Sequence, residues 1–391
     1  MDYRIENGKI IIELPERIDG TVSVKTEQEL SRIIDGHREL NPVLAADKLN
    51  YISSAGLRVL LKLKKTFGKE IIVQDVSPEI YEIFSTTGFD VILDVRKRLR
   101  EISVEGCEII GKGGNGIVYR LDTETIVKVY YGDRNDIEKI RSNQTVTKNV
   151  FIHEIPSAIA FDMVKVGDSY GIVYEMIDAR SMLQEMIANP DKLEHYAEMI
   201  ADTLKKLHRT EFEKGTLPDA RDYFRKDIQT IADAGYLNPK ETEKLNRLID
   251  DIPERNTFIH HDFHPGNIML QKGEIILIDV EDAGLGHPVI DLSSMYLVYV
   301  TAAKSNWGKK EIPLGKKEFA KVWDIFIKRY FETTDKKEIA EINRILNGYS
   351  RIKMLHGVVS SPRVPDILKK TASPMIKRKL MASIDSLHPI P

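Results

Sequence analysis

The sequence predicts a mixed α/β and α+β protein: a small α/β domain in residues 1–100, then a bilobal domain with lobes at 101–178 and 179–391. Strand-like and helix-like patterns alternate through the first part. A glycine loop between two strand-like runs opens the second part. After residue 181, apolar residues recur mostly at helical spacing around one polar stretch. The length of 391 residues suits two or three domains.

The composition is that of an ordinary folded protein. Hydrophobic residues make up 42% and charged residues 30%, and the net charge of −3 does not favour nucleic acid as a partner. Cys107 is the one cysteine, which excludes an internal disulfide and a cysteine zinc cluster. The start, MDYRIENGK, lacks the apolar core of a signal peptide, and no uncharged apolar run approaches about 18 residues. We therefore expect a cytoplasmic protein without membrane contact.

The elements of residues 1–100 follow from their patterns. Asn7-Gly8 is a strong hairpin signal between the runs Tyr3–Glu6 and Lys9–Leu14. Further strand-like runs follow at Val43–Asp47, Glu70–Asp75 and Val91–Val95. Helical patterns lie at Thr26–Asp35, Leu57–Phe67 and from Pro78 to Gly88. Strands that alternate with helices predict a mixed or parallel sheet covered by helices.

Ser53 and Ser54 precede the helical run at Leu57 and are candidates for a helix N-cap. The stretch NYISSAGLRVLL resembles the STAS domain of anti-sigma factor antagonists, and the resemblance covers nearly all of residues 1–100. In that family a serine at this helix N-terminus is phosphorylated to control partner binding, which makes Ser54 the candidate phospho-acceptor. Ser53 stands where the family has an acidic residue, so an unmodified helix cap is the alternative.

Gly111, Gly113 and Gly116 form a G-x-G-x-x-G pattern within GKGGNGIVYRL. The strand-like runs Ile117–Leu121 and Thr125–Tyr131 follow it, whereas a dinucleotide-binding loop requires a helix there. The loop has no Gly-Lys-Ser/Thr, which excludes a Walker loop. A glycine loop between strands is typical of kinases, in which the loop backbone covers nucleotide phosphates.

Lys128 lies inside the apolar run TIVKVYY, where a charge is costly unless it is paired or bound to an anion. A nucleotide phosphate would explain it, and a strand lysine that points to solvent is the alternative. A kinase lysine also pairs with a glutamate of the next helix, and Glu138 is the only glutamate of the helical run 136–148. The strand-like run before Glu175-Met176-Ile177 predicts the connector between lobes, so Glu175 and Ile177 are candidate contacts for adenine.

The polar stretch lies at Thr257–Leu292. Asp262 follows His260 by two residues and precedes Asn267 by five, in the order H-x-D-x-x-x-x-N. Two short strand-like runs come next, and the second ends on Asp279, beside which we expect Asn267 to lie. Phosphoryl transfer from Mg²⁺-ATP needs one carboxylate to orient the hydroxyl, and an amide and a carboxylate to hold the metal. The alternative is a polar turn, a hairpin and an acidic surface loop.

The segments LKKLHRTEF, HHDFHPGN and LIDVEDAG together resemble the aminoglycoside phosphotransferase/choline kinase-like family, from about Ile102 to at least Val300. That family has a protein-kinase-like fold and transfers the γ-phosphate of ATP to hydroxyl groups. The resemblance makes Asp262 the catalytic base, Asn267 and Asp279 the magnesium ligands, and Asp291 a structural aspartate that braces the catalytic loop. His261 stands where the family more often has glycine, a departure that bears on the acceptor pocket.

Two other features of the polar stretch bear on its function. His260, His261 and His264 with Asp262 suggest a zinc site, but adjacent histidines diverge and no H-E-x-x-H helix is present. Asp291 follows so soon after Asp279 that a long activation loop has no room. This spacing favours a small-molecule phosphotransferase, or a protein kinase that is always switched on.

We therefore expect an ATP- and Mg²⁺-dependent phosphotransferase for a hydroxyl of a small molecule, with the first domain as regulator. The alternatives are a signalling kinase that phosphorylates a STAS serine such as Ser54, and a pseudokinase scaffold that contacts an anti-sigma-type protein. By resemblance, the C-terminal helices build the acceptor site; the helical runs are Leu292–Ala303, Lys317–Phe331, Lys336–Leu346 and Tyr349–Val359. The sequence does not identify the acceptor.

Overall fold

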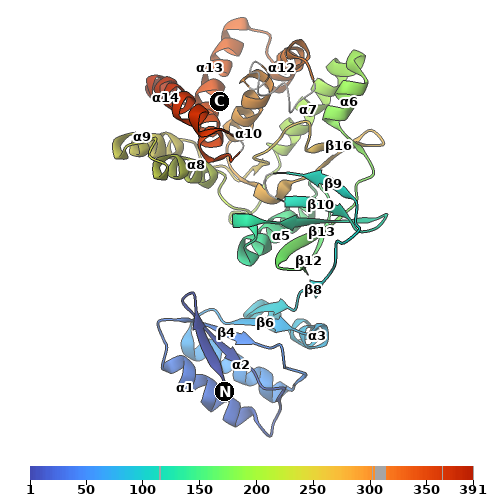
Figure 1. The fold of residues 1–391 in the computed structure, drawn as a ribbon, viewed down its shortest axis with the longest axis vertical. Helices are drawn as coiled ribbons and strands as arrows, with labels where there is room; N and C mark the ends of the chain where they lie inside the picture. The colour runs from blue at the N-terminus through green and yellow to red at the C-terminus, as the bar shows by residue number, and fades with distance from the viewer. Residues whose placement is uncertain (114–115, 302, 304–313, 363, 391) are drawn as a thin grey trace. The chain divides into compact units, whose positions relative to one another are not determined.

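The computed structural model describes residues 1–113, 116–301, 303, 314–362 and 364–390 (Figure 1). The chain divides into two compact units, Met1–Ser103 and Val104–Pro391. Each unit has its own cluster of buried apolar side chains. Across the described residues, no helix combines the length and the apolar character needed to cross a lipid bilayer.

The first unit is built on a five-stranded sheet in the order β1-β2-β4-β6-β7. Its strands are β1 (Tyr3–Glu6), β2 (Lys9–Glu13), β4 (Asn41–Ala45), β6 (Ile72–Val76) and β7 (Asp94–Lys97), with β3 (Arg17–Ile18) and β5 (Tyr51–Ile52) as a separate short pair. The predicted Asn7-Gly8 hairpin is confirmed: β1 and β2 pair antiparallel, and both turn residues have positive φ, as a type I′ turn requires. The neighbouring strands β2, β4, β6 and β7 are parallel.

Four helices accompany this sheet: α1 (Ser23–Asp35), α2 (Ser54–Phe67), α3 (Pro78–Thr86) and α4 (Phe89–Ile92). The strand predicted at Val91–Val95 is wrong in its first half. Gly88 adopts φ 72°, and the chain then makes the short helix α4, whose Phe89 ring packs edge-on against Phe84 at 6.4 Å. Val91 is consequently 90% exposed, and pairing begins only at Asp94.

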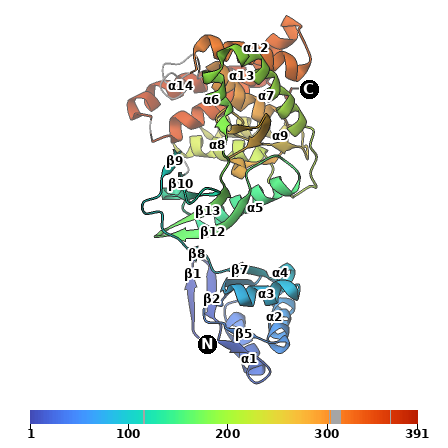
Figure 2. The same ribbon diagram turned by 90° about the vertical axis from the view of Figure 1, so that its right-hand side faces the viewer.

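The second unit begins with an antiparallel sheet in which β12, β13, β11, β10 and β9 are successive neighbours. Their bounds are β9 (Ile109–Lys112), β10 (Gly116–Arg120), β11 (Thr125–Tyr130), β12 (Ala160–Val166) and β13 (Ser169–Glu175), and β8 (Arg100–Glu101) precedes them in the chain. Helix α5 (Ile137–Ile152) packs against β12 and β13, as both ribbon views show (Figures 1 and 2). Gly114 and Asn115, at the tip of the predicted glycine loop, lie outside the described residues.

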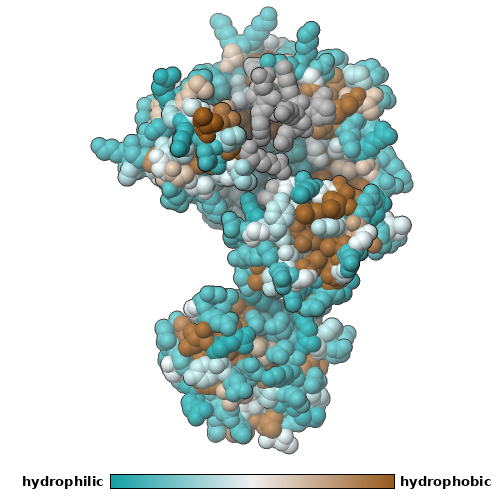
Figure 3. Space-filling view, in the orientation of Figure 1, coloured by the Kyte–Doolittle hydropathy of each residue, from teal (hydrophilic) through white to brown (hydrophobic). Residues whose placement is uncertain are grey.

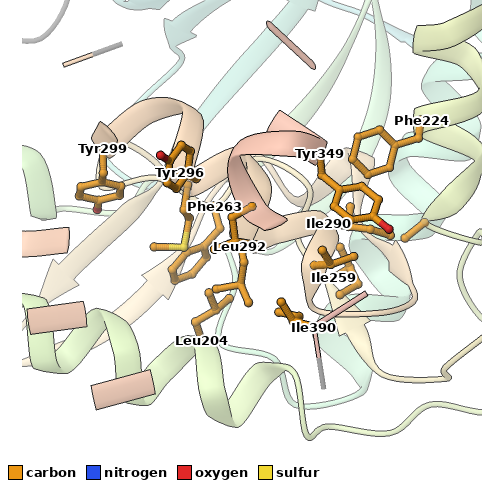
Figure 4. Packing of buried hydrophobic residues seen from close by; sticks show 14 of the residues in the cluster. Leu204, Phe224, Ile259, Phe263, Ile290, Leu292, Tyr296, Tyr299, Tyr349 and Ile390 are labelled. Atoms are coloured by element: carbon orange, nitrogen blue, oxygen red, sulfur yellow. The ribbon is translucent and has the colours of Figure 1, made fainter. Parts of the chain in front are cut away.

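The remainder of the second unit is mainly helical. Its helices are α6 (Met182–Ala188), α7 (Leu193–Leu207), α8 (Arg221–Asp233), α9 (Pro239–Asp250), α10 (Val289–Tyr296), α12 (Lys316–Phe331), α13 (Lys336–Ser360) and α14 (Asp366–Ser383). Apolar side chains from distant segments meet in its core, among them Leu204 of α7, Phe224 of α8 and Tyr349 of α13 (Figure 4). The predicted helix Leu292–Ala303 ends in a π-helical turn at Leu297–Thr301, and the residues beyond it are only partly described.

The two helices predicted at Lys336–Leu346 and Tyr349–Val359 are one continuous helix, α13. Gly348 does not end it, because a glycine inside a helix costs only about 1 kcal/mol. A Cβ at this position would collide with the Leu387 side chain. The glycine therefore lets Leu387 pack directly on the helix backbone.

Candidate active site

A β-hairpin brings Asn267 and Asp279 to the same end of a small sheet. Strands β16 (Ile268–Gln271) and β17 (Glu274–Leu277) pair in a register that sets Ile268 opposite Leu277. One step further, the Ile278 N–H donates to the Asn267 carbonyl at 3.0 Å. Asp279 follows directly, so the hairpin register alone brings its backbone close to Asn267.

Asp291 supports the loop that carries Asp262. It is fully buried, and its carboxylate accepts the backbone N–H of His260 at 2.9 Å and that of His261 at 2.6 Å. His208 Nε2 lies 3.1 Å from the same carboxylate. These contacts lower the pKa of Asp291 to about 2, although burial by itself would raise it. The loop backbone is therefore held by a buried, ionised side chain.

Asp262 projects from this loop with its carboxylate 59% exposed. The Asn267 amide nitrogen donates to its backbone oxygen at 3.0 Å and to its Oδ2 at 3.2 Å. His264 Nε2 lies 3.6 Å from Oδ2. Loss of hydration would raise the pKa of Asp262, but the hydrogen bond and charge of His264 outweigh it and hold the pKa below its ordinary value. The carboxylate is therefore ionised at neutral pH and open to a ligand.

Two residues at the site have left-handed backbone conformations that favour glycine: His261 at φ 73° and Asp279 at φ 60°. Such residues cost of order 1–3 kcal/mol and persist where their surroundings hold them. His261 is held by its N–H bond to Asp291 and by its ring nitrogen Nε2, 3.0 Å from the Ala220 carbonyl. Burial and the Lys353 ammonium lower the pKa of His261 to about 3, so this ring is neutral. The His261 side chain ties the loop that carries Asp262 to the start of α8.

The side chain of Lys128 on β11 reaches the segment that follows β17. Its Nζ lies 2.6 Å from Asp279 Oδ1 and 3.0 Å from Glu281 Oε1. Burial disfavours the charged lysine, but the carboxylates of Glu281 and Asp279 outweigh burial and raise the pKa of Lys128 above its ordinary value. A surface-pointing strand lysine is therefore excluded, since its side chain is only 13% exposed.

The predicted pairing of Lys128 with Glu138 is corrected by the structure. Glu138 lies exposed in the first turn of α5, and Lys128 forms its ion pairs in the described part of the chain with Asp279 and Glu281. Helix α5 instead turns Asn143 toward Glu281, with Asn143 Nδ2 at 3.4 Å from Glu281 Oε2. Sequence reasoning missed Glu281, and the lack of a glutamate further along α5 was the signal that could have prompted a search elsewhere.

The sequence-predicted residues, apart from Glu138 and Ser54, converge on one cleft of about 910 Å³. It is lined by Gly111, Gly113, Gly116, Lys128, Glu175, Ile177, Asp262, Asn267 and Asp279, together with Glu281 and apolar side chains such as Ile110 and Val118. Ile109 and Ile110 of β9 are partly exposed, and apolar surface gathers over β9 and β10 in the space-filling view (Figure 3). The lining of the cleft thus combines apolar side chains with cationic and anionic groups.

Gly116 and Gly113 offer a matched pair of substitutions. A Cβ on Gly116 would come within 2.6 Å of the Val129 carbonyl oxygen, whereas a Cβ on Gly113 would meet no heavy atom within 4 Å. We expect Gly116→Ala to lower the free energy of unfolding by about 1–3 kcal/mol, since β10 must shift from β11. Gly113→Ala should change it by less than about 0.5 kcal/mol. Denaturant unfolding of both variants checks this; equal effects would contradict it.

The histidines of the polar stretch have packing partners. His260 is fully buried and lies edge-on to Phe258 and Phe263, with ring centroids 6.5 and 5.8 Å apart. Its Nδ1 accepts the Asp262 N–H at 3.3 Å. In the described part of the chain, no group of three or more His, Cys, Asp or Glu side chains is arranged to hold a metal ion. The imidazole of His260 therefore contributes to loop shape.

Ser54 belongs to the first unit and is the first residue of α2. Ser53 is the N-cap, and its hydroxyl accepts the Ala55 N–H at 3.2 Å. The side chain of Ser54 is exposed. Ser53 thus performs the capping, which leaves the Ser54 hydroxyl accessible.

Comparison with known proteins identifies the family of the domain that contains this site. Residues 108–312 match the model of the phosphotransferase enzyme family. The chain belongs to that family. Residues 1–102 match the STAS domain. These matches confirm the predicted family resemblances and the predicted fold class, a STAS-type α/β domain followed by a protein-kinase-like phosphotransferase domain. The protein is therefore an enzyme, a phosphotransferase with an alcohol group as acceptor, as predicted.

Individual relatives match one part or the other. "Putative anti-sigma factor antagonist BtrV" of Bordetella bronchiseptica is 33% identical over 93 residues, which cover 23% of this chain and 78% of that protein. "Protein LicA homolog" of Mycoplasma capricolum subsp. capricolum is 24% identical over 210 residues, 51% of this chain and 75% of that protein. Among solved structures, ADP-bound aminoglycoside phosphotransferase APH(2'')-Ib is 16% identical, with a TM-score of 0.47. The match covers 78% of this chain and 98% of the chain of that phosphotransferase.

Proposed function

We propose that this protein transfers the γ-phosphate of ATP to a hydroxyl group of a small molecule, with the STAS domain as its regulator. The convergence of Asp262, Asn267, Asp279 and Lys128 in one cleft carries this proposal. Asp262 orients the acceptor hydroxyl and takes its proton, and the ammonium of Lys128 contacts the phosphates. The glycine loop and the connector residues Glu175 and Ile177 border the nucleotide, with the lobe boundary near residue 178.

The donor atoms of Asn267 and Asp279 suit Mg²⁺. Magnesium prefers oxygen ligands and commonly takes one or two from the protein, the rest coming from phosphates and water. The Asn267 Nδ2 donates to Asp262, which turns the amide oxygen to the other side. We propose that this oxygen and the Asp279 carboxylate hold the ion, which would offset charge on the phosphates.

The acceptor pocket is proposed beside Asp262, between the catalytic loop and helices α8 and α13. Lys353 of α13 donates to the His261 carbonyl at 3.2 Å and to Ser294 Oγ at 2.6 Å. On α8, Asp227 Oδ1 lies 3.2 Å from His356 Nδ1, and burial raises the pKa of Asp227. These half-buried groups of both charges favour a polar, hydroxylated acceptor.

An ATP-turnover screen tests the proposal. The purified chain with Mg²⁺-ATP would be assayed for ADP release across sugars, amino alcohols and aminoglycosides, with Asp262→Asn as the matched inactive variant. An acceptor-dependent rate that Asp262→Asn abolishes supports the proposal. ATP binding without turnover for any acceptor would favour a pseudokinase scaffold instead. Absence of nucleotide binding would refute both.

A signalling kinase that phosphorylates a STAS serine is the second candidate. The exposed hydroxyl of Ser54 at the start of α2 favours it, because a phosphate there would meet free helix N–H groups. Incubation with labelled ATP and peptide mapping would decide, with the Ser54→Ala chain as control. A second assay would offer the Asp262→Asn chain as substrate for the active enzyme. Absence of label at Ser54 in both assays, and on partner STAS domains, would exclude this candidate.

A further inference from the structure

Glu281 is a buried carboxylate on which several donors converge. It lies in the short 3₁₀ turn η3 (Val280–Asp282), two residues after Asp279, and is 5% exposed. Its Oε1 accepts the Tyr130 hydroxyl at 2.6 Å and the Tyr174 hydroxyl at 2.7 Å. The same oxygen lies 3.0 Å from Lys128 Nζ. Groups from β11, β13 and α5 therefore meet one side chain of the helical lobe.

The burial of the Glu281 carboxylate is unfavourable unless each of its partners is present. Burying an ionised carboxyl removes its hydration, and only a close cation and good hydrogen bonds offset this loss. The cation here is Lys128, and both tyrosines are almost fully buried. Burial, followed by the Glu281 charge, raises the pKa of both tyrosine hydroxyls, so they stay protonated and act as donors. The buried Glu281 carboxylate therefore has a cation and two hydroxyl donors, and the loss of any one of them would make its burial less favourable.

The Asp279 carboxylate cannot pair closely with Lys128 and coordinate a metal ion equally well at the same time. Its Oδ1 is now 2.6 Å from Lys128 Nζ, but the proposed function assigns this carboxylate to Mg²⁺. Glu281 then remains as the anionic partner of the lysine. Helix α5 turns the uncharged Asn143 toward this point, and Glu138 lies exposed in its first turn.

We propose that Glu281 is the positioning residue for Lys128, and that Tyr130 and Tyr174 hold the Glu281 carboxylate in place. This inference rests on the proposed function. The lysine that contacts the phosphates is then aligned by the loop that carries the metal ligand Asp279. The charged partner of the lysine then lies in η3 of the helical lobe and not on α5. The Lys128–Glu281 pair also links the sheet to the helical lobe.

The test compares Glu281→Gln with Glu138→Gln in the full chain. The glutamine keeps the shape of the side chain but removes its charge, so Lys128 loses its remaining anion once Asp279 binds metal. We expect the Kd for ATP to rise at least tenfold in Glu281→Gln with Mg²⁺, and by less with EDTA because Asp279 then still pairs with Lys128. In Glu138→Gln the Kd should stay within twofold under both conditions.

Further outcomes separate the possible roles. A loss of ATP affinity that a high Mg²⁺ concentration restores would make Glu281 a metal ligand, and a loss in Glu138→Gln alone would return the role to α5; either overturns the proposal. Should Glu281→Gln fail to fold, as judged by circular dichroism, Tyr130→Phe and Tyr174→Phe each remove one donor and should raise the Kd two- to fivefold. An unchanged Kd for ATP in both tyrosine variants would also refute the proposed role of Glu281. If the unmodified chain does not bind ATP, the proposed function has failed, whereas equal binding by the unmodified chain and Glu281→Gln refutes only the role of Glu281.

Discussion

Replacing Asp262 with asparagine is expected to lower kcat by about 10²–10⁴-fold, the range typical for loss of a general base. The asparagine still accepts a hydrogen bond from the hydroxyl, but it cannot take the proton. The Asn267 bond to the backbone oxygen of residue 262 is retained, so the loop should keep its shape. The Kd for ATP should therefore change by less than about threefold, as measured by titration calorimetry.

Asp324→Asn is a matched control for that experiment. Asp324 is an exposed aspartate of α12 whose contact is a surface ion pair with Lys328, worth at most about 1 kcal/mol. The kcat of Asp324→Asn should equal that of the unmodified chain.

The activity should not depend on protonation of Asp262 near neutral pH. Because His264 holds the pKa of Asp262 below its ordinary value, the carboxylate stays ionised, and kcat should not fall between pH 8 and pH 6 through protonation of Asp262. A kcat of Asp262→Asn within a factor of three of the unmodified chain would remove the general-base role.

Asp291→Ala is expected to give the largest loss of stability, about 3–5 kcal/mol of the free energy of unfolding. The substitution leaves the N–H groups of His260 and His261 buried without their acceptor, and it removes the partner of the His208 Nε2 atom. Activity should fall with stability, because the two N–H groups belong to the loop that carries Asp262. Urea unfolding followed by fluorescence measures the loss. A change below about 1 kcal/mol would contradict the bracing role.

The stability that Asp291 contributes should depend on pH in one direction. Its pKa is about 2 in the folded chain and close to 4 when unfolded, so the contribution is complete above pH 4 and lost as the pH falls through about 2. The difference corresponds to roughly 2–3 kcal/mol. Asp291→Asn, which carries no charge at any pH, should therefore lie closest to the unmodified chain in stability at pH 2 and furthest from it above pH 4. A constant difference across this range would be inconsistent with a depressed pKa.

Much of the candidate site could be read from local pattern. Asn267 and Asp279 flank a short hairpin, and its register brings them to one end whatever the rest of the chain does. The N-cap at Ser53 and the Asn7-Gly8 turn are equally local, because each depends on a few neighbouring residues. The predicted strand at Val91–Val95 was wrong in its first half, because the chain makes the short helix α4 before the strand begins and the Phe89 ring packs against the nearby Phe84.

The sequence by itself determined that a glycine loop, a strand lysine and an H-x-D-x-x-x-x-N loop occur in kinase order, and that a STAS-like domain precedes them. Only the tertiary structure decided what pairs with Lys128. The answer lies in a loop 151 residues away along the chain for Asp279, and Glu281 follows two residues later. A buried ammonium pairs with whichever carboxylate the packed elements bring within reach, and that proximity leaves no periodic trace in the sequence. The helix that usually supplies this carboxylate in kinases supplies an asparagine here, and the segment that carries Asp279 and Glu281 provides the charge.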